Sequence, residues 1–176
     1  MSRVYSSVRS LLSQSIRSVN PPLVYGPYVP HYPYPEKERL GSNGFLYTLF
    51  DGILGREPPK QIFPPYFCDV RDVAVAHVRA LELAPTLDKR KKRFFISGGS
   101  FTVREAVEHL NRAWNILEFR LPYPGDAPTP GTEVALPTID TSLASTELQL
   151  KEYITWKKCV NGAVDSLIEA EKDWSQ

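Results

Sequence analysis

The chain has 176 residues, 42% hydrophobic and 23% charged, a composition typical of one globular domain and not of a disordered protein. Its 21 basic and 20 acidic side chains leave a net charge of +1, which excludes the strong positive field that nucleic acid or an acidic membrane would require. The two isolated cysteines, Cys68 and Cys159, lack zinc-ligand spacing, so we expect no metal site and a reduced, cytoplasmic compartment. No apolar run approaches the roughly 18 residues of a membrane span.

Residues 1–19 form the first segment. Val4, Val8, Leu12 and Ile16 recur at helical spacing, among seven serines and three arginines and without any acidic residue. This pattern predicts an amphipathic helix and leaves two interpretations open. The segment is either an ordinary surface helix or a mitochondrial transit segment, which has the same composition.

Residues 20–35 contain six prolines, which exclude a helix and force extended or turn backbone. Leu23 and its neighbours favour a short strand that ends at Val24 or Tyr25. The next apolar cluster predicts a helix over residues 44–55 that stops at Gly55. Its predicted buried residues are Phe45, Leu46, Leu49, Phe50 and Ile53.

A helix is predicted over residues 72–84, capped by Asp69 or Asp72 and ended by Pro85. Arg71, between the two aspartates, indicates a local charge network that ties the helix to its surroundings. The predicted apolar face comprises Val73, His77, Ala80, Leu81 and Ala84. His77 is therefore interpreted as a packed core residue and not as a catalytic base.

The basic run of residues 89–93 suggests either nucleic-acid binding or a solvated loop, and the neutral overall charge favours the loop. Residues 94–96 then predict a buried strand that stops at Gly98. Thr102 and Glu105 form a capping box, which predicts a helix over 102–114.

The last third of the sequence is loop followed by helix. Residues 119–139 hold five prolines, Asp140 can cap a short helix over 142–148, and Thr155 begins a long final helix. At most three strands are visible, which is few for a free-standing α/β sheet. The predicted buried face of the final helix comprises Trp156, Val160, Ala163, Val164, Leu167, Ile168 and Trp174.

Three blocks in order resemble the extended short-chain dehydrogenase/reductases of the epimerase/dehydratase superfamily. They are NPPLVYGP at 20–27, FCDVRDVAVAH at 67–77 and RFFISGGSFT at 93–102. The branch that includes dihydroflavonol reductase, cinnamoyl-CoA reductase and fungal aldehyde/ketone reductases is the most similar. The final helix and Asp140 agree with that family.

The resemblance implies an α/β fold, an incomplete Rossmann-like domain made of its last strands and helices, with the small C-terminal substrate-binding lobe over residues 20–176. It implies NADP as the cofactor and a small carbonyl compound as the substrate. By position it assigns the nicotinamide site to Pro21, Pro22, Leu23 and Val24, a pyrophosphate contact to Ser42, and the turn into the substrate lobe to Tyr25, Gly26 and Pro27.

The same resemblance shows what the sequence lacks. There is no Gly-x-x-Gly-x-x-Gly turn, and the family's catalytic Tyr-x-x-x-Lys pair has only Tyr5 and Arg9 as a chance match, so no catalytic residue is assigned. We therefore expect the C-terminal part of a reductase that is inactive alone. The alternative is a non-catalytic protein that pairs with another chain or binds an apolar ligand among its aromatic residues. Those residues are Tyr25, Tyr28, Tyr32, Tyr34, Phe63, Tyr66 and Phe67.

Overall fold

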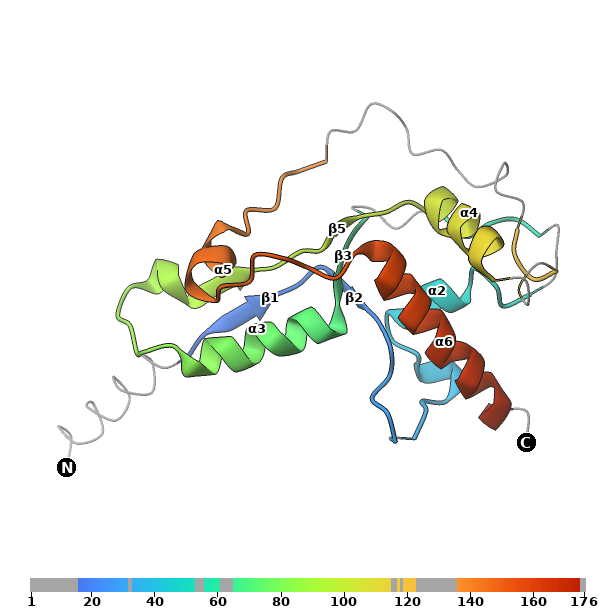
Figure 1. Cartoon of the computed structure of the whole chain (residues 1–176), viewed down its shortest axis with the longest axis horizontal. Helices are drawn as coiled ribbons and strands as arrows, with labels where there is room; N and C mark the ends of the chain where they lie inside the picture. The colour runs from blue at the N-terminus through green and yellow to red at the C-terminus, as the bar shows by residue number, and fades with distance from the viewer. Residues whose placement is uncertain are drawn as a thin grey trace.

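The structure is a computed structural model that describes residues 16–31, 33–52, 56–60, 65–114, 117, 119–122 and 136–174 (Figure 1). Strands, short 3-10 turns and helices alternate along the chain. In order they are β1 (Ser18–Asn20), β2 (Leu23–Tyr25), η1 (Lys37–Arg39), α2 (Asn43–Tyr47), β3 (Tyr66–Asp69), α3 (Val70–Glu82), η2 (Lys89–Lys92), β4 (Arg93–Phe95), β5 (Gly99–Ser100), α4 (Val103–Ala113), α5 (Ser142–Glu147) and α6 (Trp156–Trp174).

The strands form two small sheets. Strand β1 pairs in parallel with β4, with Val19 opposite Phe94, while β2 pairs in parallel with β3 and β5 adds to β3 in the antiparallel sense. Pro21 and Pro22 stand between β1 and β2. Because proline cannot donate a ladder hydrogen bond, this pair ends the first strand and moves the chain from one sheet to the other.

Two hydrophobic cores fill the elongated molecule. The larger core joins α2, α4 and α6 with β2 and β3, and the smaller one lies between α3, β4 and α5, as the two ends of the molecule in Figure 1 show. Phe50 and Leu110 are fully buried in the first core, and Phe94 and Ile96 in the second. The mixed α/β arrangement confirms the predicted fold class.

Four of the predicted helices, α3 to α6, are confirmed within the described residues, and α2 is confirmed in part. Helix α4 has the predicted capping box, in which the Thr102 side chain accepts from the Glu105 N–H and the Glu105 carboxylate accepts from the Thr102 N–H. Helix α6 buries the predicted Val160 and Leu167, and the Asp140 carboxylate accepts from the first N–H of α5. Helix α2 ends earlier than predicted, at Tyr47, and continues as tight turns to residue 52.

The buried face of α3 is only in part the predicted one. The helix is capped by Asp69, as expected, and it buries Asp72, Ala76 and the predicted Ala80, while the predicted Val73 packs against the smaller core. The small alanines let the helix lie close to β1 and β3. The other predicted residues, His77, Leu81 and Ala84, are exposed, and Leu81 is 85% exposed. His77 is therefore not packed in a core, with Nδ1 2.8 Å from the Val73 carbonyl oxygen.

The strand predictions also needed correction. Residues 18 and 19, which were expected to end the N-terminal helix, belong to β1. Residues 1–15 lie outside the described part of the chain, so the rest of that predicted helix is not tested. The same holds for the predictions on Tyr32, Ile53, Gly55 and Phe63. Strand β3 was missed. The strand at residues 94–96 is buried on one face only, because Phe95 is 47% exposed.

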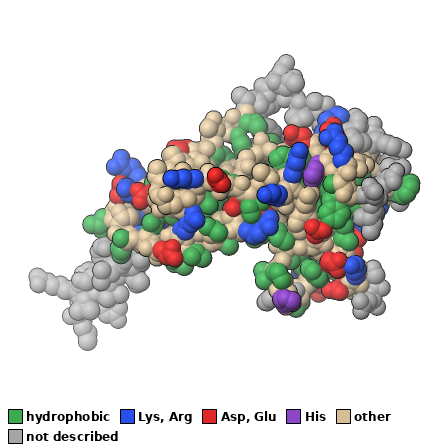
Figure 2. All heavy atoms as spheres, viewed as in Figure 1, with side chains coloured by type: hydrophobic (Ala, Val, Ile, Leu, Met, Phe, Trp, Pro, Cys, Tyr) green, Lys and Arg blue, Asp and Glu red, His purple; other side chains and the backbone are tan. Residues whose placement is uncertain are grey.

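Charged groups of both signs are interspersed over the face drawn in Figure 2. The basic run follows this pattern, since Lys91 pairs with Glu147 at 2.8 Å and Arg90 with Asp88 at 3.4 Å. It is a solvated turn and not a basic patch. No helix within the described ranges has the length and apolar character to cross a lipid bilayer.

Candidate functional site

The candidate site is a cleft of about 170 Å³ at the carboxyl ends of β2 and β3. The two strands run in parallel with Tyr25 opposite Asp69, so the segments that follow them leave the sheet side by side. Ligands of open α/β sheets bind at this edge. The lining residues are Val24, Tyr25, Gly26, Pro27, Tyr28, Leu40, Ser42, Asn43 and Val70.

Gly26 allows the chain to turn sharply into the cleft. Its φ of +138° is a conformation that residues with a side chain rarely adopt. A Cβ at this position would lie 2.8 Å from Cγ1 of Val70 and 3.3 Å from Oδ1 of Asp69. The site therefore requires a glycine at position 26, because of the positive φ and because a side chain would have no room.

Asn43, at the start of α2, fixes the position of this turn. Its Nδ2 donates to the Gly26 carbonyl oxygen at 2.8 Å, and its Oδ1 accepts from the Gly26 N–H at 3.3 Å. The side chain is 6% exposed and is one of the few buried polar residues of the described chain. A buried amide that satisfies both backbone groups holds the β2 end against the helix, because leaving either group unpaired would cost about 1–3 kcal/mol.

Tyr28 and Tyr25 form the aromatic side of the cleft. The Tyr28 hydroxyl donates to the Leu40 carbonyl oxygen at 3.2 Å, and its N–H donates to Oγ of Ser166 on α6 at 3.1 Å. Burial raises the pKa of both phenols, so each stays neutral at physiological pH. They shape the cleft as neutral apolar surfaces, and neither is placed to give up a proton.

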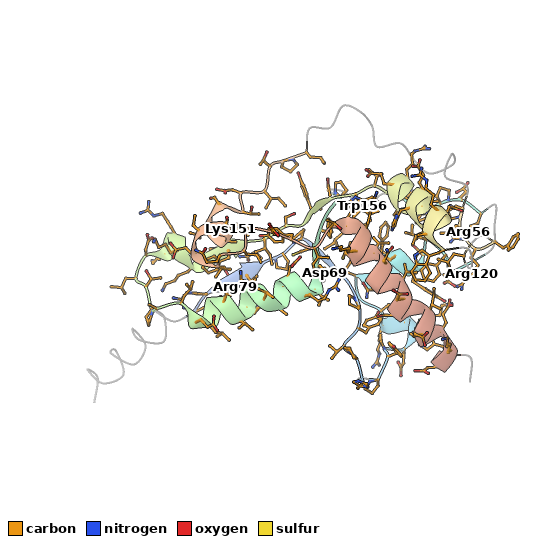
Figure 3. The ribbon with its side chains drawn as sticks, viewed as in Figure 1. Arg56, Asp69, Arg79, Arg120, Lys151 and Trp156 are labelled. Carbon is orange, nitrogen blue, oxygen red and sulfur yellow. The ribbon has the colours of Figure 1, made fainter. Side chains whose placement is uncertain are left out.

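A charged network lies next to Gly26, where β3 meets α3 at Asp69, a residue labelled in Figure 3. The Asp69 carboxylate is fully buried and accepts from Arg71 Nε at 2.8 Å and from Nη2 at 2.7 Å. Burial acts to raise the pKa of Asp69, but the hydrogen bonds from Arg71 and from Cys159 outweigh it and lower the pKa. Asp72 accepts from the Ile154 N–H at 2.9 Å, so it is Asp72 that ties α3 to the segment before α6.

A second network braces the lobe behind the cleft. Arg120 donates to the Glu171 carboxylate at 2.9 Å and to the Phe50 carbonyl oxygen at 2.9 Å, and the Tyr47 hydroxyl donates to the same carboxylate at 2.8 Å. Arg56 lies beside Arg120 in Figure 3 and donates to its carbonyl oxygen at 3.5 Å. These bonds join α2 and α6, the two helices that carry Asn43 and Ser166.

The structure brings most of the predicted site residues together. Val24, Ser42, Tyr25, Gly26 and Pro27 all line the cleft, whereas Pro21, Pro22 and Leu23 do not. Leu23 instead packs against the larger core. The functional roles assigned to these eight residues stay predictions.

Sequence reasoning missed three lining residues, Leu40, Asn43 and Val70. A single amide at the start of an apolar helix, next to the predicted Ser42, was the available signal for Asn43. The aromatic residues expected to form one ligand pocket are divided: Tyr25 and Tyr28 line the cleft, but Phe67 is fully buried in the core and the Tyr66 hydroxyl donates to the Pro137 carbonyl oxygen.

Comparisons with known proteins agree with this geometry. An uncharacterized oxidoreductase of Schizosaccharomyces pombe is 39% identical over 57% of this chain and 27% of its own length. The ketoreductase azaE of Aspergillus niger is 32% identical over 86% of this chain and 43% of its own length. These relatives confirm the resemblance of the chain to the extended short-chain reductases. No family profile matches it.

A solved structure shares the fold of this chain. The crystal structure of Gre2 from Candida albicans in complex with NADPH superimposes with a TM-score of 0.69 at 22% identity, over 94% of this chain and 49% of that one. The chain therefore spans between about a quarter and a half of the length of these relatives.

Proposed function

We propose that the chain forms the substrate side of the nicotinamide site in an NADP-dependent reductase of aldehydes, ketones or related carbonyl compounds. The observation that carries this proposal is the cleft at the carboxyl ends of β2 and β3, lined by Val24, Tyr25, Gly26, Pro27 and Ser42. The similarity to a ketoreductase and to a reductase crystallised with NADPH supports it.

The residues present fit a carboxamide-bearing ring. Strand β2 pairs on one side only within the described chain, so its other edge can offer main-chain N–H and C=O groups to an amide. The neutral Tyr25 and Tyr28 supply apolar surface beside that edge. NADP bound here would supply the hydride for carbonyl reduction.

The volume of the cleft agrees with a binding site of which this chain forms only one side. Its volume of about 170 Å³ lies below the roughly 300–1,000 Å³ of complete small-molecule sites. The dinucleotide turn and the Tyr/Lys pair that the family uses are not in this sequence. The chain would thus bind and orient, and we expect no reductase activity from it alone.

Thermal unfolding of the purified 176-residue chain, with and without millimolar NADPH, tests the proposal. We expect a cooperative transition that rises with NADPH and that no longer rises in Ser42→Phe, which fills the cleft. Ser142→Phe, at an exposed position on α5, is the matched control and should keep the response. A cooperative transition that NADPH leaves unmoved in the unsubstituted chain would contradict the proposal and favour a non-catalytic, ligand-binding or pairing protein.

The cytosol is the compartment we propose, since Cys68 and Cys159 are free and buried. A fluorescent protein fused to residues 1–19 should remain in the cytosol. Import of that fusion into mitochondria would instead show that the segment is a transit peptide.

A further inference from the structure

The guanidinium of Arg71 has an edge that binds nothing in the described part of the chain. Its Nε and Nη2 donate to the two oxygens of Asp69, at 2.8 Å and 2.7 Å. A guanidinium holds five N–H groups in one plane, and a carboxylate bound at its side takes two of them. The other three, one on Nη2 and two on Nη1, have no hydrogen-bond partner among the described residues. The Arg71 side chain is 48% exposed, so this second edge is open to a ligand.

This open edge borders the cleft. A Cβ on Gly162 of α6 would lie 3.2 Å from Cδ of Pro27, which lines the cleft, and 3.7 Å from Nη2 of Arg71. Nη2 and the Pro27 side of the cleft therefore face one point on α6, where a glycine has no side chain to cover the guanidinium. On the other side, Oδ1 of Asp69 lies 3.3 Å from where a Cβ on Gly26 would stand. Asp69 thus fixes the guanidinium beside the turn that forms the cleft.

Arg71 places a positive charge at the rim of a cleft whose lining is uncharged. The lining residues are apolar or carry only hydroxyl and amide groups. Two acidic groups lie near the guanidinium, Asp69 and Asp72, and both are buried. The Asp69 oxygens accept from Arg71, and Asp72 accepts from the Ile154 N–H. An anion that enters the cleft would therefore meet the open N–H groups of Arg71 and no exposed carboxylate among these residues.

We propose that Arg71 determines the substrate specificity of the cleft by binding the carboxylate of a short oxo acid. The carboxylate would accept from Nη1 and Nη2, the two nitrogens of the open edge, in the bidentate geometry that arginine favours. The carbonyl group of the acid would extend toward the lining formed by Gly26 and Pro27. The inference rests on the proposed function for the reaction, but the binding itself can be measured without NADPH.

The size and the charge of the site favour this class of substrate. A volume of about 170 Å³ admits a small compound. An uncharged aldehyde or ketone would leave the second edge of Arg71 bound only to water, so it would gain nothing from the positive charge. An oxo acid adds a charge-assisted contact at two points, and such contacts are shorter and stronger than those between neutral groups. The carboxylate therefore contributes both affinity and orientation.

Titration of the 176-residue chain, followed by nuclear magnetic resonance, tests the inference. The first two probes are 2-oxobutanoate and butanone, which have the same number of carbon atoms but differ in the carboxylate. Butanoate is the third probe, because it has the carboxylate without the oxo group. We expect 2-oxobutanoate to bind at least tenfold more tightly than butanone, and butanoate to bind more weakly than 2-oxobutanoate.

Two variants separate Arg71 from other cationic groups. Arg71→Lys keeps the charge but loses the planar fork, so it should weaken 2-oxobutanoate binding at least fivefold. Arg71→Gln is combined with Asp69→Asn, because a buried Asp69 carboxylate without its partner would destabilise the fold. This double variant should bind the acid no more tightly than butanone. Arg71→Lys keeps a cation beside Asp69, so it remains a test if the double variant fails to fold.

Arg112→Gln is the matched control. Arg112 pairs with Glu108 on α4, its side chain is 78% exposed, and it lies outside the cleft. The substitution removes the same charge as Arg71→Gln, so the affinity for 2-oxobutanoate should change less than twofold if the contact at Arg71 is what binds the acid.

Equal binding of 2-oxobutanoate and butanone would overturn the inference, and so would a preference for the acid that survives in both Arg71 variants. Butanoate binding as tight as that of 2-oxobutanoate would show an anion site without selectivity for oxo acids, which also contradicts it. The proposed function is tested separately, by the response of thermal unfolding to NADPH. Oxo-acid binding through Arg71 without that response would contradict only the proposed function, and the response without oxo-acid binding would contradict only this inference.

Discussion

Replacement of Gly26 by alanine tests the account of the cleft most directly. The backbone at Gly26 has a φ of +138°, and an added Cβ would lie 2.8 Å from Cγ1 of Val70. Holding a residue with a side chain in a sparsely populated backbone region costs about 1–3 kcal/mol. Forcing an extra carbon into occupied space costs about 1–3 kcal/mol more. We therefore expect Gly26→Ala to lower the free energy of unfolding by about 2–6 kcal/mol.

Urea unfolding followed by tryptophan fluorescence and by circular dichroism measures this change. Gly44→Ala is the control, because Gly44 lies in α2 and its added Cβ would meet only Cβ of Leu40 at an ordinary 3.5 Å. An alanine in a helix restricts the unfolded chain more than glycine does. The control should therefore raise the free energy of unfolding by up to about 1 kcal/mol, a change of opposite sign.

A double substitution separates the two causes. Adding Val70→Ala removes the carbon that the new Cβ would meet, so it should recover the steric part of the loss and leave the backbone part of about 1–3 kcal/mol. If Gly26→Ala lowers the free energy of unfolding no more than Gly44→Ala does, the turn at Gly26 does not require a glycine and the account of the cleft is wrong. If Val70→Ala restores all of the lost stability, the positive φ carries no cost and the backbone argument is wrong.

Two further predictions concern the elements around the cleft. Thr102→Ala should lower the free energy of unfolding by about 1 kcal/mol, because the N-terminus of α4 loses the acceptor of the Glu105 N–H, whereas Thr102→Ser should keep it; urea unfolding measures both. Asp69→Asn should reduce the loss of thermal stability that the chain shows as the pH falls from 7 to 3. The pKa of Asp69 is lowered in the folded chain, so the charged form adds stability above its unfolded pKa of about 4, and this is lost as the pH falls through the lower folded pKa. Thermal midpoints between pH 7 and pH 3 check this, and an unchanged acid slope would contradict it.

Features that depend on near neighbours along the chain could be predicted from the sequence alone. The capping box at Thr102, the cap at Asp69 and the buried residues of α6 follow from spacings of two to four residues, which the helix geometry fixes. The resemblance assigned Gly26 to the turn into the substrate lobe and Ser42 to a pyrophosphate contact, and the structure places both residues in the lining of one cleft.

Features that depend on contacts between distant residues became visible in the folded chain and not before. Asn43 reaches Gly26 across 17 positions, and the buried face of α3 is set by how closely Ala76 and Ala80 allow it to approach the strands, not by its most apolar side chains. Strand β3 has no alternating pattern, because Phe67 and Cys68 are buried on both of its faces. Packing across the sheet, which no local periodicity encodes, therefore determined where the cleft closes.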